Sequence, residues 1–484
     1  MKLLTHTFQL AFEILRFLFH ADERKKIEGA QFAKPSEYGA FLNGRHRGLL
    51  LDGQGLKLSE SDSFQNVCVI ARVGAGKTSR YIIPNVLNRA EENCSLVIND
   101  PKGEVYQYTS QFLTDRGFRV VVLDPEHLAR SSRFNPLLEV RNDIEFEQLA
   151  ELLVKCGNPD DKDSFWNKGA ARFVGLFLKC LKNAERDSPG YFTLHNLYFL
   201  FQNFGSDGRG LDEFMARYTV YPDDPDNPTL WNEWKGILTG NEEGVRSFVL
   251  NALTALRALS NPNIAKLTAS SDFDLAAIRR QKTVIYFITP PQHLEYYSFL
   301  ISVFFRTVFN VCMRELPDKQ TLPVYVLYDE FGHSMIPNFV STANTIRGYR
   351  VSLSIVLQSI AQLNAQYGRE YAYSIQGGFN TYMTYSGSDP ETVKFFETIS
   401  GRQRITQTNG AKNPVEHYRE SNLINANEVR TIPSGKALLI SSNRQPILLN
   451  TSPYFEVGRW SRATKRGAVQ VENPRPDRLE YVRL

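Results

Sequence analysis

Cysteine is scarce in this chain, with five in 484 residues. They are Cys68, Cys94, Cys156, Cys180 and Cys312. None of them forms a C-x-x-C pair, and their spacing suits neither a zinc site nor a disulfide framework. Isolated cysteines of this kind are typical of reduced, buried thiols in a cytosolic protein. The sequence therefore argues against the zinc-finger and disulfide-stabilised classes.

The chain also lacks a long hydrophobic run. A membrane-spanning helix needs about 18 or more largely uncharged apolar residues, and no such run occurs. Residues 1–20 are rich in Leu and Phe, but Glu13 and Arg16 interrupt them. No apolar core followed by a small-residue cleavage site marks a signal peptide either. We predict no transmembrane segment.

Residues 1–20 have helical periodicity instead. Their apolar positions are Leu4, Phe8, Ala11, Phe12, Leu15, Leu18 and Phe19. This spacing predicts an amphipathic helix, and we assign residues 1–45 to this helix and a linker. The polar face is not notably basic, which favours packing on the protein itself or on a partner over lying on a membrane surface.

A strong charge imbalance is absent as well. The net charge is +4, from 56 Lys and Arg against 52 Asp and Glu. A balanced total neither requires nor excludes nucleic acid, because a basic surface can be local. The length predicts two to three domains.

The sequence does contain a phosphate-binding motif. The apolar run Val67–Ile70 is followed by Ala71–Thr78, which matches G-x-x-x-x-G-K-[ST] except at Ala71. Backbone N–H groups of such a loop surround phosphate oxygens at a helix N-terminus. We expect the nucleotide to contact Val73, Gly74, Ala75, Gly76, Lys77, Thr78 and Ser79. Lys77 would reach the terminal phosphates and Thr78 would bind Mg²⁺.

The motif can be interpreted in two ways. The first is a nucleotide-binding site, in which Ala71 counts against full activity because alanine disfavours positive φ. The alternative to a nucleotide site is a glycine-rich strand-to-helix turn that happens to contain a lysine.

Two later strands end in polar residues. Asp329 and Glu330 directly follow the apolar run Val324–Tyr328, and Gln358 directly follows Val351–Leu357. In a P-loop ATPase the first acid binds Mg²⁺ through water and the second polarises the attacking water. We assign these roles to Asp329 and Glu330, and we expect Gln358 to relay the position of the γ-phosphate.

Arg347 and Arg350 lie between the acids and Gln358. An arginine there could reach across a subunit boundary to a neighbour's γ-phosphate. From spacing alone, a solvated surface arginine or a local ion pair is an equal alternative. For His333, which follows the acids, we favour a structural role.

The alternation of strand, helix and strand over residues 65–124 predicts a doubly wound α/β fold. Its strand at residues 95–100 would bring Asn99 and Asp100 to the ligand-binding edge. Residues 46–140 and 276–456 are the predicted parts of the nucleotide-binding domain, and residues 141–275 an inserted all-α domain. Residues 457–484 are basic on balance and lack an apolar pattern, so we predict a flexible tail.

Several motifs resemble those of the type IV coupling proteins, the VirD4/TraG-like ATPases of conjugation and type IV secretion. They occur in the family's order over roughly residues 45–450: Asp100-Pro101-Lys102-Gly103-Glu104, Asp329-Glu330-Phe331-Gly332, Ile336-Pro337-Asn338, Thr345-Ile346-Arg347, Ser354-Ile355-Val356-Leu357-Gln358-Ser359, Gln362-Leu363, Tyr367-Gly368, Ser388-Asp389-Pro390-Glu391-Thr392, Leu423-Ile424 and Glu428-Val429-Arg430. The resemblance implies a RecA-like domain carrying an inserted all-α domain. It implies ATP and Mg²⁺ as cofactors and Arg347 as the better candidate for an arginine finger.

The resemblance also implies partners. Members are similar to homohexameric, DNA-dependent ATPases that bring a relaxase–DNA complex or effector proteins to a type IV secretion channel. We expect single-stranded DNA to be bound without sequence preference. Typical members begin with transmembrane helices and this chain shows none. We therefore expect a cytoplasmic location, peripheral on the inner membrane if residues 1–20 dock on a membrane protein.

Two alternatives share the P-loop. One is a FtsK/HerA-like DNA translocase, which the helical residues after 140 disfavour. The other is a docking adaptor that binds nucleotide without significant turnover, which Ala71 keeps open.

Overall fold

The computed structural model describes residues 25–158, 165–204, 209–408, 416–441, 443–472 and 478–484. The amphipathic helix predicted for residues 1–20 lies outside these ranges. Within them, no helix combines the length and apolar character that a membrane span requires.

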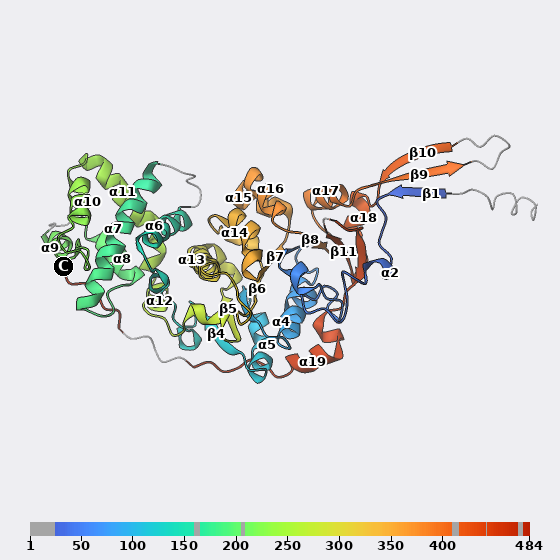
Figure 1. Cartoon of the computed structure of the whole chain (residues 1–484), viewed down its shortest axis with the longest axis horizontal. Coiled ribbons are helices and arrows are strands. Elements are labelled where there is room, and N and C mark those ends of the chain that lie inside the picture. Colours follow the sequence, from blue (N-terminus) through green and yellow to red (C-terminus); the bar gives the residue numbers. More distant parts are fainter. Residues whose placement is uncertain (1–24, 159–164, 205–208, 409–415, 442, 473–477) are drawn as a thin grey trace, which may run out of the picture.

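A nine-stranded sheet forms the centre of the molecule, in the order β12-β11-β8-β2-β7-β6-β3-β5-β4 (Figure 1). Its parallel strands are β8 (Thr381–Thr384), β2 (Val67–Ile70), β7 (Val351–Leu357), β6 (Val324–Tyr328), β3 (Ser95–Asp100), β5 (Thr283–Ile288) and β4 (Arg119–Leu123). Two antiparallel strands, β11 (Lys436–Ser441) and β12 (Ile447–Asn450), extend one edge. The apolar runs at Val67–Ile70, Ser95–Asp100, Val324–Tyr328 and Val351–Leu357 therefore all form strands of one sheet.

Both faces of this sheet are covered, which explains the nearly continuous apolar runs of its strands. Side chains alternate between two cores: Val67 and Val69 belong to one, and Cys68 and Ile70 to the other. The first core includes residues of α4 (Ile83–Arg89), α5 (Glu104–Asp115) and α19 (Gly458–Thr464). The second includes residues of α13 (Leu294–Cys312), α14 (Phe339–Thr345), α15 (Ile360–Tyr367), α16 (Arg369–Gly377) and α17 (Pro390–Ile399). Three short helices complete this part: α2 (Pro35–Tyr38), α3 (Glu60–Ser63) and α18 (Ala426–Arg430).

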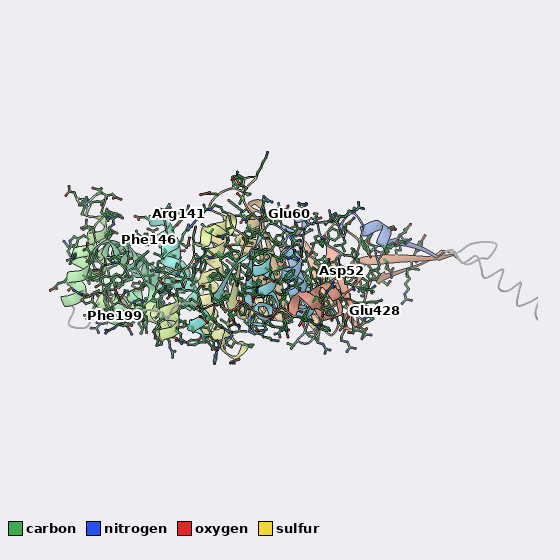
Figure 2. The ribbon with its side chains drawn as sticks, turned by 90° about the horizontal axis from the view of Figure 1, so that it is seen from below. Asp52, Glu60, Arg141, Phe146, Phe199 and Glu428 are labelled. Atoms are coloured by element: carbon green, nitrogen blue, oxygen red, sulfur yellow. The ribbon has the colours of Figure 1, made fainter. Side chains whose placement is uncertain are left out.

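Helices alone form the named elements between β4 and β5 in the described residues, as the sequence predicts. They include α6 (Asp143–Gly157), α7 (Phe165–Asp187), α8 (Leu194–Gln202), α9 (Arg209–Tyr218), α10 (Thr229–Leu238), α11 (Glu242–Ala255) and α12 (Pro262–Leu267). They gather at one end of an elongated molecule, where α6 packs on α13 (Figure 1). Figure 2 shows Phe146 and Phe199 in this half and Asp52 and Glu428 in the other. The exact domain boundaries stay a prediction.

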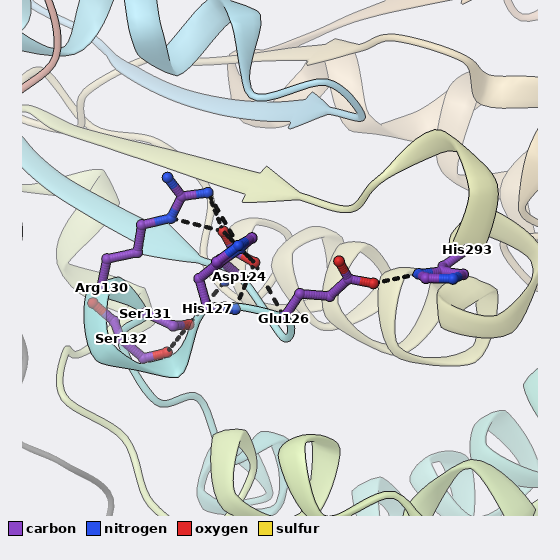
Figure 3. Close-up of polar contacts among 7 residues, drawn as sticks. All are labelled: Asp124, Glu126, His127, Arg130, Ser131, Ser132 and His293. Carbon is purple, nitrogen blue, oxygen red and sulfur yellow. Dashed lines mark hydrogen bonds and ion pairs between the residues drawn. The ribbon is translucent and has the colours of Figure 1, made fainter.

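The chain leaves the sheet for the helices at a charged cluster after β4 (Figure 3). The buried Asp124 carboxylate accepts hydrogen bonds from Arg130 Nε at 2.8 Å and from the amides of Glu126 and His127 at 3.1 Å. Glu126 also contacts His293, at the start of α13. These contacts connect the loop after β4, where the chain leaves the sheet for the inserted helices, to the start of α13 after β5.

A second sheet was not predicted. It consists of three antiparallel strands, β1 (Lys25–Gly29), β9 (Arg402–Thr408) and β10 (Glu416–Asn422). This sheet extends from the end of the molecule opposite the inserted helices (Figure 1). Their sequences carry polar residues at both alternating positions, so they show no period-two apolar signal. The apolar residues at the start of Leu49-Leu50-Leu51-Asp52-Gly53 predict a short strand and turn, but Leu50 forms only an isolated bridge with Lys57 and residues 49–53 contain no named strand.

The prediction of a flexible tail at residues 457–484 is also wrong for its described part. α19 begins at Gly458, and the Trp460 side chain is buried, with Nε1 donating to Gly53 O at 3.0 Å. Val482 is buried too, against the inserted helices. The buried face of α19 consists of Trp460 and the small residues Ala463 and Thr464, and Val482 is buried alone, so the sequence shows little apolar periodicity.

Candidate nucleotide-binding site

The predicted phosphate-binding loop connects β2 to a helix that continues into α4. Gly74 and Gly76 have positive φ of 81° and 85°, which a glycine adopts without strain. The helix begins at Lys77 with a π-helical turn over Thr78–Ile82, in which the Ile83 N–H donates to Thr78 O. Pro84 accounts for this wider turn, because it has no N–H to donate to the preceding turn.

The structure removes the conformational objection to Ala71. The described non-glycine residues with positive φ are Asn66, Glu330, Asn338 and Arg350. Ala71 is not among them. It is fully buried, and its N–H donates to Leu357 O at 3.0 Å, which continues the pairing of β2 with β7. A glycine is therefore not required at this position by the backbone.

The strand order explains why distant residues meet. β2, β7, β6 and β3 are consecutive neighbours, and all four are parallel. The loop after β2, Gln358 after β7, the acids after β6 and Asn99 in β3 therefore share one edge of the sheet. This edge is where open α/β sheets bind ligands.

Thr78 and Asp329 form the candidate magnesium site. The Thr78 hydroxyl donates to Asp329 Oδ2 at 2.9 Å, and Asn99 Nδ2 donates to Asp329 O at 2.7 Å. Burial, reinforced by the charge of Glu330, raises the pKa of Asp329 to about 6. The donors are hard oxygens, which suit Mg²⁺. Asn99 Oδ1 is buried and has no hydrogen-bond partner among the described residues, which leaves an acceptor at this edge for a ligand or water.

Lys77 lies deep in the same site. Its side chain is almost fully buried, and Nζ donates to Leu357 O at 3.4 Å. Burial lowers the pKa of Lys77, while Glu330 and Asp329 act in the opposite direction. A buried ammonium next to two carboxylates is suited to neutralising phosphate charge.

Glu330 is held by a neighbouring amide. Gln358 Nε2 donates to Glu330 Oε2 at 2.8 Å. Glu330 has a positive φ of 56°, a conformation in which a non-glycine residue carries strain. Strain of this kind concentrates at functional sites, and here it turns the carboxylate toward the end of β7.

From the sequence, Gln362 is part of a family motif with no assigned role at the site, and His333 is predicted to be structural. Gln362 Oε1 accepts from the Gln358 N–H at 3.2 Å, and Gln362 Nε2 lies 3.2 Å from His333 Nε2. His333 Nε2 is 3.8 Å from Glu330 Oε2. A side chain at Gly332 would collide with Gln362, because a Cβ there would lie 2.2 Å from its amide carbon. Its position in the sequence could have indicated this contact, because Gln362 lies in the first turn of the helix that follows Gln358.

Asp100 has a different role from its neighbour Asn99. Its Oδ2 accepts from the Tyr106 N–H at 2.8 Å, in the first turn of α5. Burial raises the pKa of Asp100 to about 7. This carboxyl therefore supports the start of α5 beside the site.

The structure does not bring Arg347 to this edge. Arg347 is exposed and lies in the turn before β7, whereas Gln358 follows β7. A seven-residue strand spans about 23 Å. Arg350 is held locally, with Nη1 donating to Thr321 O at 3.0 Å. Arg347 thus lies at the edge opposite the Lys77 of its own chain.

The sheet, the phosphate-binding loop and the residues at the ends of β6 and β7 define a RecA-like fold of the P-loop class. The chain belongs to the family described as type IV secretory system conjugative DNA transfer, whose model matches residues 26–475. This match confirms the resemblance to the coupling proteins.

Similarity to individual proteins of this family agrees with the match to the family model. The chain is 24% identical over 430 residues to the protein VirD4 of Rhizobium radiobacter, covering 84% of this chain and 59% of that protein. It is 22% identical to the conjugal transfer protein TraG of the same organism, covering 84% and 64%. The chain therefore spans about three-fifths of the curated relatives that it matches.

A solved structure confirms the predicted fold. The plasmid coupling protein TrwB, in complex with ADP and Mg²⁺, superimposes with a TM-score of 0.70 at 14% identity. The match covers 89% of this chain and 95% of TrwB.

Proposed function

We propose that this chain binds and hydrolyses Mg²⁺–ATP. The observation that supports this most directly is the convergence of Lys77, the Thr78–Asp329 pair and the Glu330–Gln358 pair at one sheet edge. Phosphoryl transfer needs charge neutralisation and positioning more than covalent chemistry. These residues supply both.

Each residue has one role in this proposal. Backbone N–H groups of residues 73–79 hold the phosphates, and Lys77 neutralises the terminal ones. Thr78 and Asp329 would hold Mg²⁺, which supplies further charge neutralisation when it is bound. Glu330 accepts a proton from the attacking water, and Gln358 orients Glu330 through their hydrogen bond.

We further propose that hydrolysis drives the transfer of DNA–relaxase complexes, of proteins, or of both to a type IV secretion channel. Family membership supports this step. The relatives named VirD4 and TraG, the latter a conjugal transfer protein, point the same way. The working form would be a homohexamer, as the family resemblance implies, and Arg347 would then act on a neighbour's nucleotide, because it lies at the edge opposite its own chain's site.

Steady-state ATP hydrolysis with and without single-stranded DNA tests the proposal. We expect turnover that requires Mg²⁺ and rises with DNA, together with DNA binding that weakens steeply with salt, as phosphate contacts require. A hexamer that binds nucleotide but shows no turnover under any of these conditions would instead support the docking adaptor.

Ala71 provides a separate prediction. Ala71→Gly is expected to leave kcat/KM for ATP within about threefold, because the backbone at this position needs no positive φ. It should lower the free energy of unfolding by about 0.4–1 kcal/mol, since glycine is more flexible in the unfolded chain. Steady-state kinetics and chemical denaturation measure the two effects. A tenfold gain in turnover would show that Ala71 restrains the loop after all.

A further inference from the structure

Residues 478–484 attach to the inserted helices at a groove formed by α8, the loop before it and α9. We call residues 478–484 the latch segment, and we call the surface lined by Gly190, His195, Asn196, Phe199 and Gly210 the α8 groove. Figure 1 shows the end of the chain beside α8 and α9, far from α19. Helix α19 belongs to the nucleotide-binding half of the molecule, whereas the latch segment lies on the helical half.

The side-chain amide of Asn196 forms hydrogen bonds to the backbone of the latch segment through both its nitrogen and its oxygen. Its Nδ2 donates to Glu480 O at 3.0 Å, and its Oδ1 accepts from the Val482 N–H at 3.0 Å. His195 Nε2 also lies 2.9 Å from Glu480 O. Asn196 is fully buried while the latch is seated, so a peptide that replaces the latch must pair with both groups of this amide.

Side chains add selectivity to this main-chain contact. The Tyr481 ring packs edge-to-face on His195 and Phe199, with centroids 5.3 and 5.1 Å apart. Val482 is 3% exposed. A Cβ on Gly210 would lie 2.6 Å from the Leu484 carbonyl carbon, so the glycine permits the close approach.

The attachment is small. Tyr481 remains 49% exposed, and Val482 is the one buried side chain among residues 478–484. Main-chain hydrogen bonds with side-chain pockets at alternate positions are a general mode of peptide recognition. Such a contact can be exchanged for another peptide of the same pattern.

The other end of this region is anchored next to the nucleotide site. Tyr106 OH donates to Val469 O at 2.5 Å, and the Val469 N–H donates to Ser110 Oγ at 3.0 Å. The Tyr106 N–H donates to Asp100, whose neighbour Asn99 contacts Asp329. Helix α5 therefore contacts both the site and the segment that leads to the latch.

We propose that the α8 groove is a peptide-binding site for an extended strand with an aromatic–aliphatic pair, and that the latch segment of the same chain is its displaceable occupant. While the latch is seated, it occupies the α8 groove. Its displacement leaves the groove open to another peptide. The inference does not depend on ATP hydrolysis.

A labelled peptide with the sequence of residues 478–484 tests the proposal by fluorescence anisotropy on the full chain. In the wild type the tethered latch competes at a high effective concentration. Val482→Asp places a carboxylate in the buried position and empties the groove without changing it. We expect the peptide to bind Val482→Asp at least tenfold more tightly than the wild type.

Three controls accompany the test. Arg483→Asp introduces the same carboxylate one residue along, at an exposed position, and should behave as wild type. Adding Phe199→Ala to Val482→Asp, or replacing the tyrosine of the peptide with alanine, should weaken binding about tenfold. Equal binding to wild type and Val482→Asp, absence of binding to Val482→Asp, or binding that both changes leave unaltered would each overturn the proposal.

Hydrogen exchange supplies a second readout without peptide binding. The amides of α8 and residues 478–484 should exchange faster in Val482→Asp than in the wild type, and saturating peptide should restore the protection of α8. Unchanged exchange in Val482→Asp would contradict the seating of the latch. ATP hydrolysis measured on the same samples separates a failure of this inference from a failure of the proposed function.

Discussion

Replacing Glu330 with glutamine is expected to lower the rate of ATP hydrolysis by about 10²–10⁴-fold, the usual contribution of a general base. Glutamine keeps the shape of the side chain and can still pair with Gln358, but it cannot accept a proton from water. Nucleotide binding depends on the loop after β2 and should change little. Steady-state turnover and equilibrium binding of a fluorescent ATP analogue measure the two quantities.

Glu370→Gln is the matched control, because Glu370 is exposed in the first turn of α16. It should hydrolyse ATP at the wild-type rate. If Glu330→Gln also retained the wild-type rate, Glu330 could not be the base. Loss of nucleotide binding in Glu330→Gln would show instead that the substitution disturbs the loop.

Arg347→Ala is expected to reduce hydrolysis by about 10³–10⁵-fold if the arginine completes a neighbour's site. Arg347 lies at the amino end of β7, and the site lies at its carboxyl end. A loss of this size therefore cannot come from the chain's own nucleotide. The effect should depend on assembly.

Mixing variants tests this geometry directly. Lys77→Ala and Arg347→Ala are each expected to be inactive alone. A mixture should regain activity, because a Lys77→Ala subunit supplies Arg347 to the intact loop of an Arg347→Ala neighbour. A mixture that stays inactive, or an Arg347→Ala variant with normal turnover, would contradict the role.

Arg350→Asn serves as the control for Arg347. Asparagine tolerates the positive φ of 54° at this position, and the substitution removes the hydrogen bond to Thr321. It should lower stability modestly and leave hydrolysis near the wild-type rate, since Arg350 is engaged within its own chain.

Much of the nucleotide site could be predicted because its signals are local. An apolar strand that ends in polar residues marks the edge of a parallel sheet wherever it occurs in the chain. This rule placed Lys77, Asp329 and Gln358 together, and the strand order of the structure brings them to one edge. The contact between Gln362 and His333 was not predicted, because a hydrogen bond between a helix and a loop has no sequence period.

Polar or sparse patterns account for the remaining errors. The strands β1, β9 and β10 form a sheet whose sequences do not alternate between apolar and polar residues. The region after Gly458 buries one large apolar side chain in α19, Trp460, beside the smaller Ala463 and Thr464, and a single residue, Val482, in a separate place. Hydrophobic periodicity detects apolar residues that are buried repeatedly on one face of an element, and it does not detect a single buried residue.

The sequence by itself determined the class of this protein, its fold and the residues expected to act on nucleotide, since each depends on short motifs or on strand-length apolar runs. Tertiary structure alone decided three other matters. It showed that Ala71 needs no positive φ, because the backbone there follows the pairing of β2 with β7. It placed Arg347 at the edge opposite its own site, and it seated residues 478–484 on Asn196. Each of these is a relation between segments far apart in the chain, which only the path of the folded backbone can set.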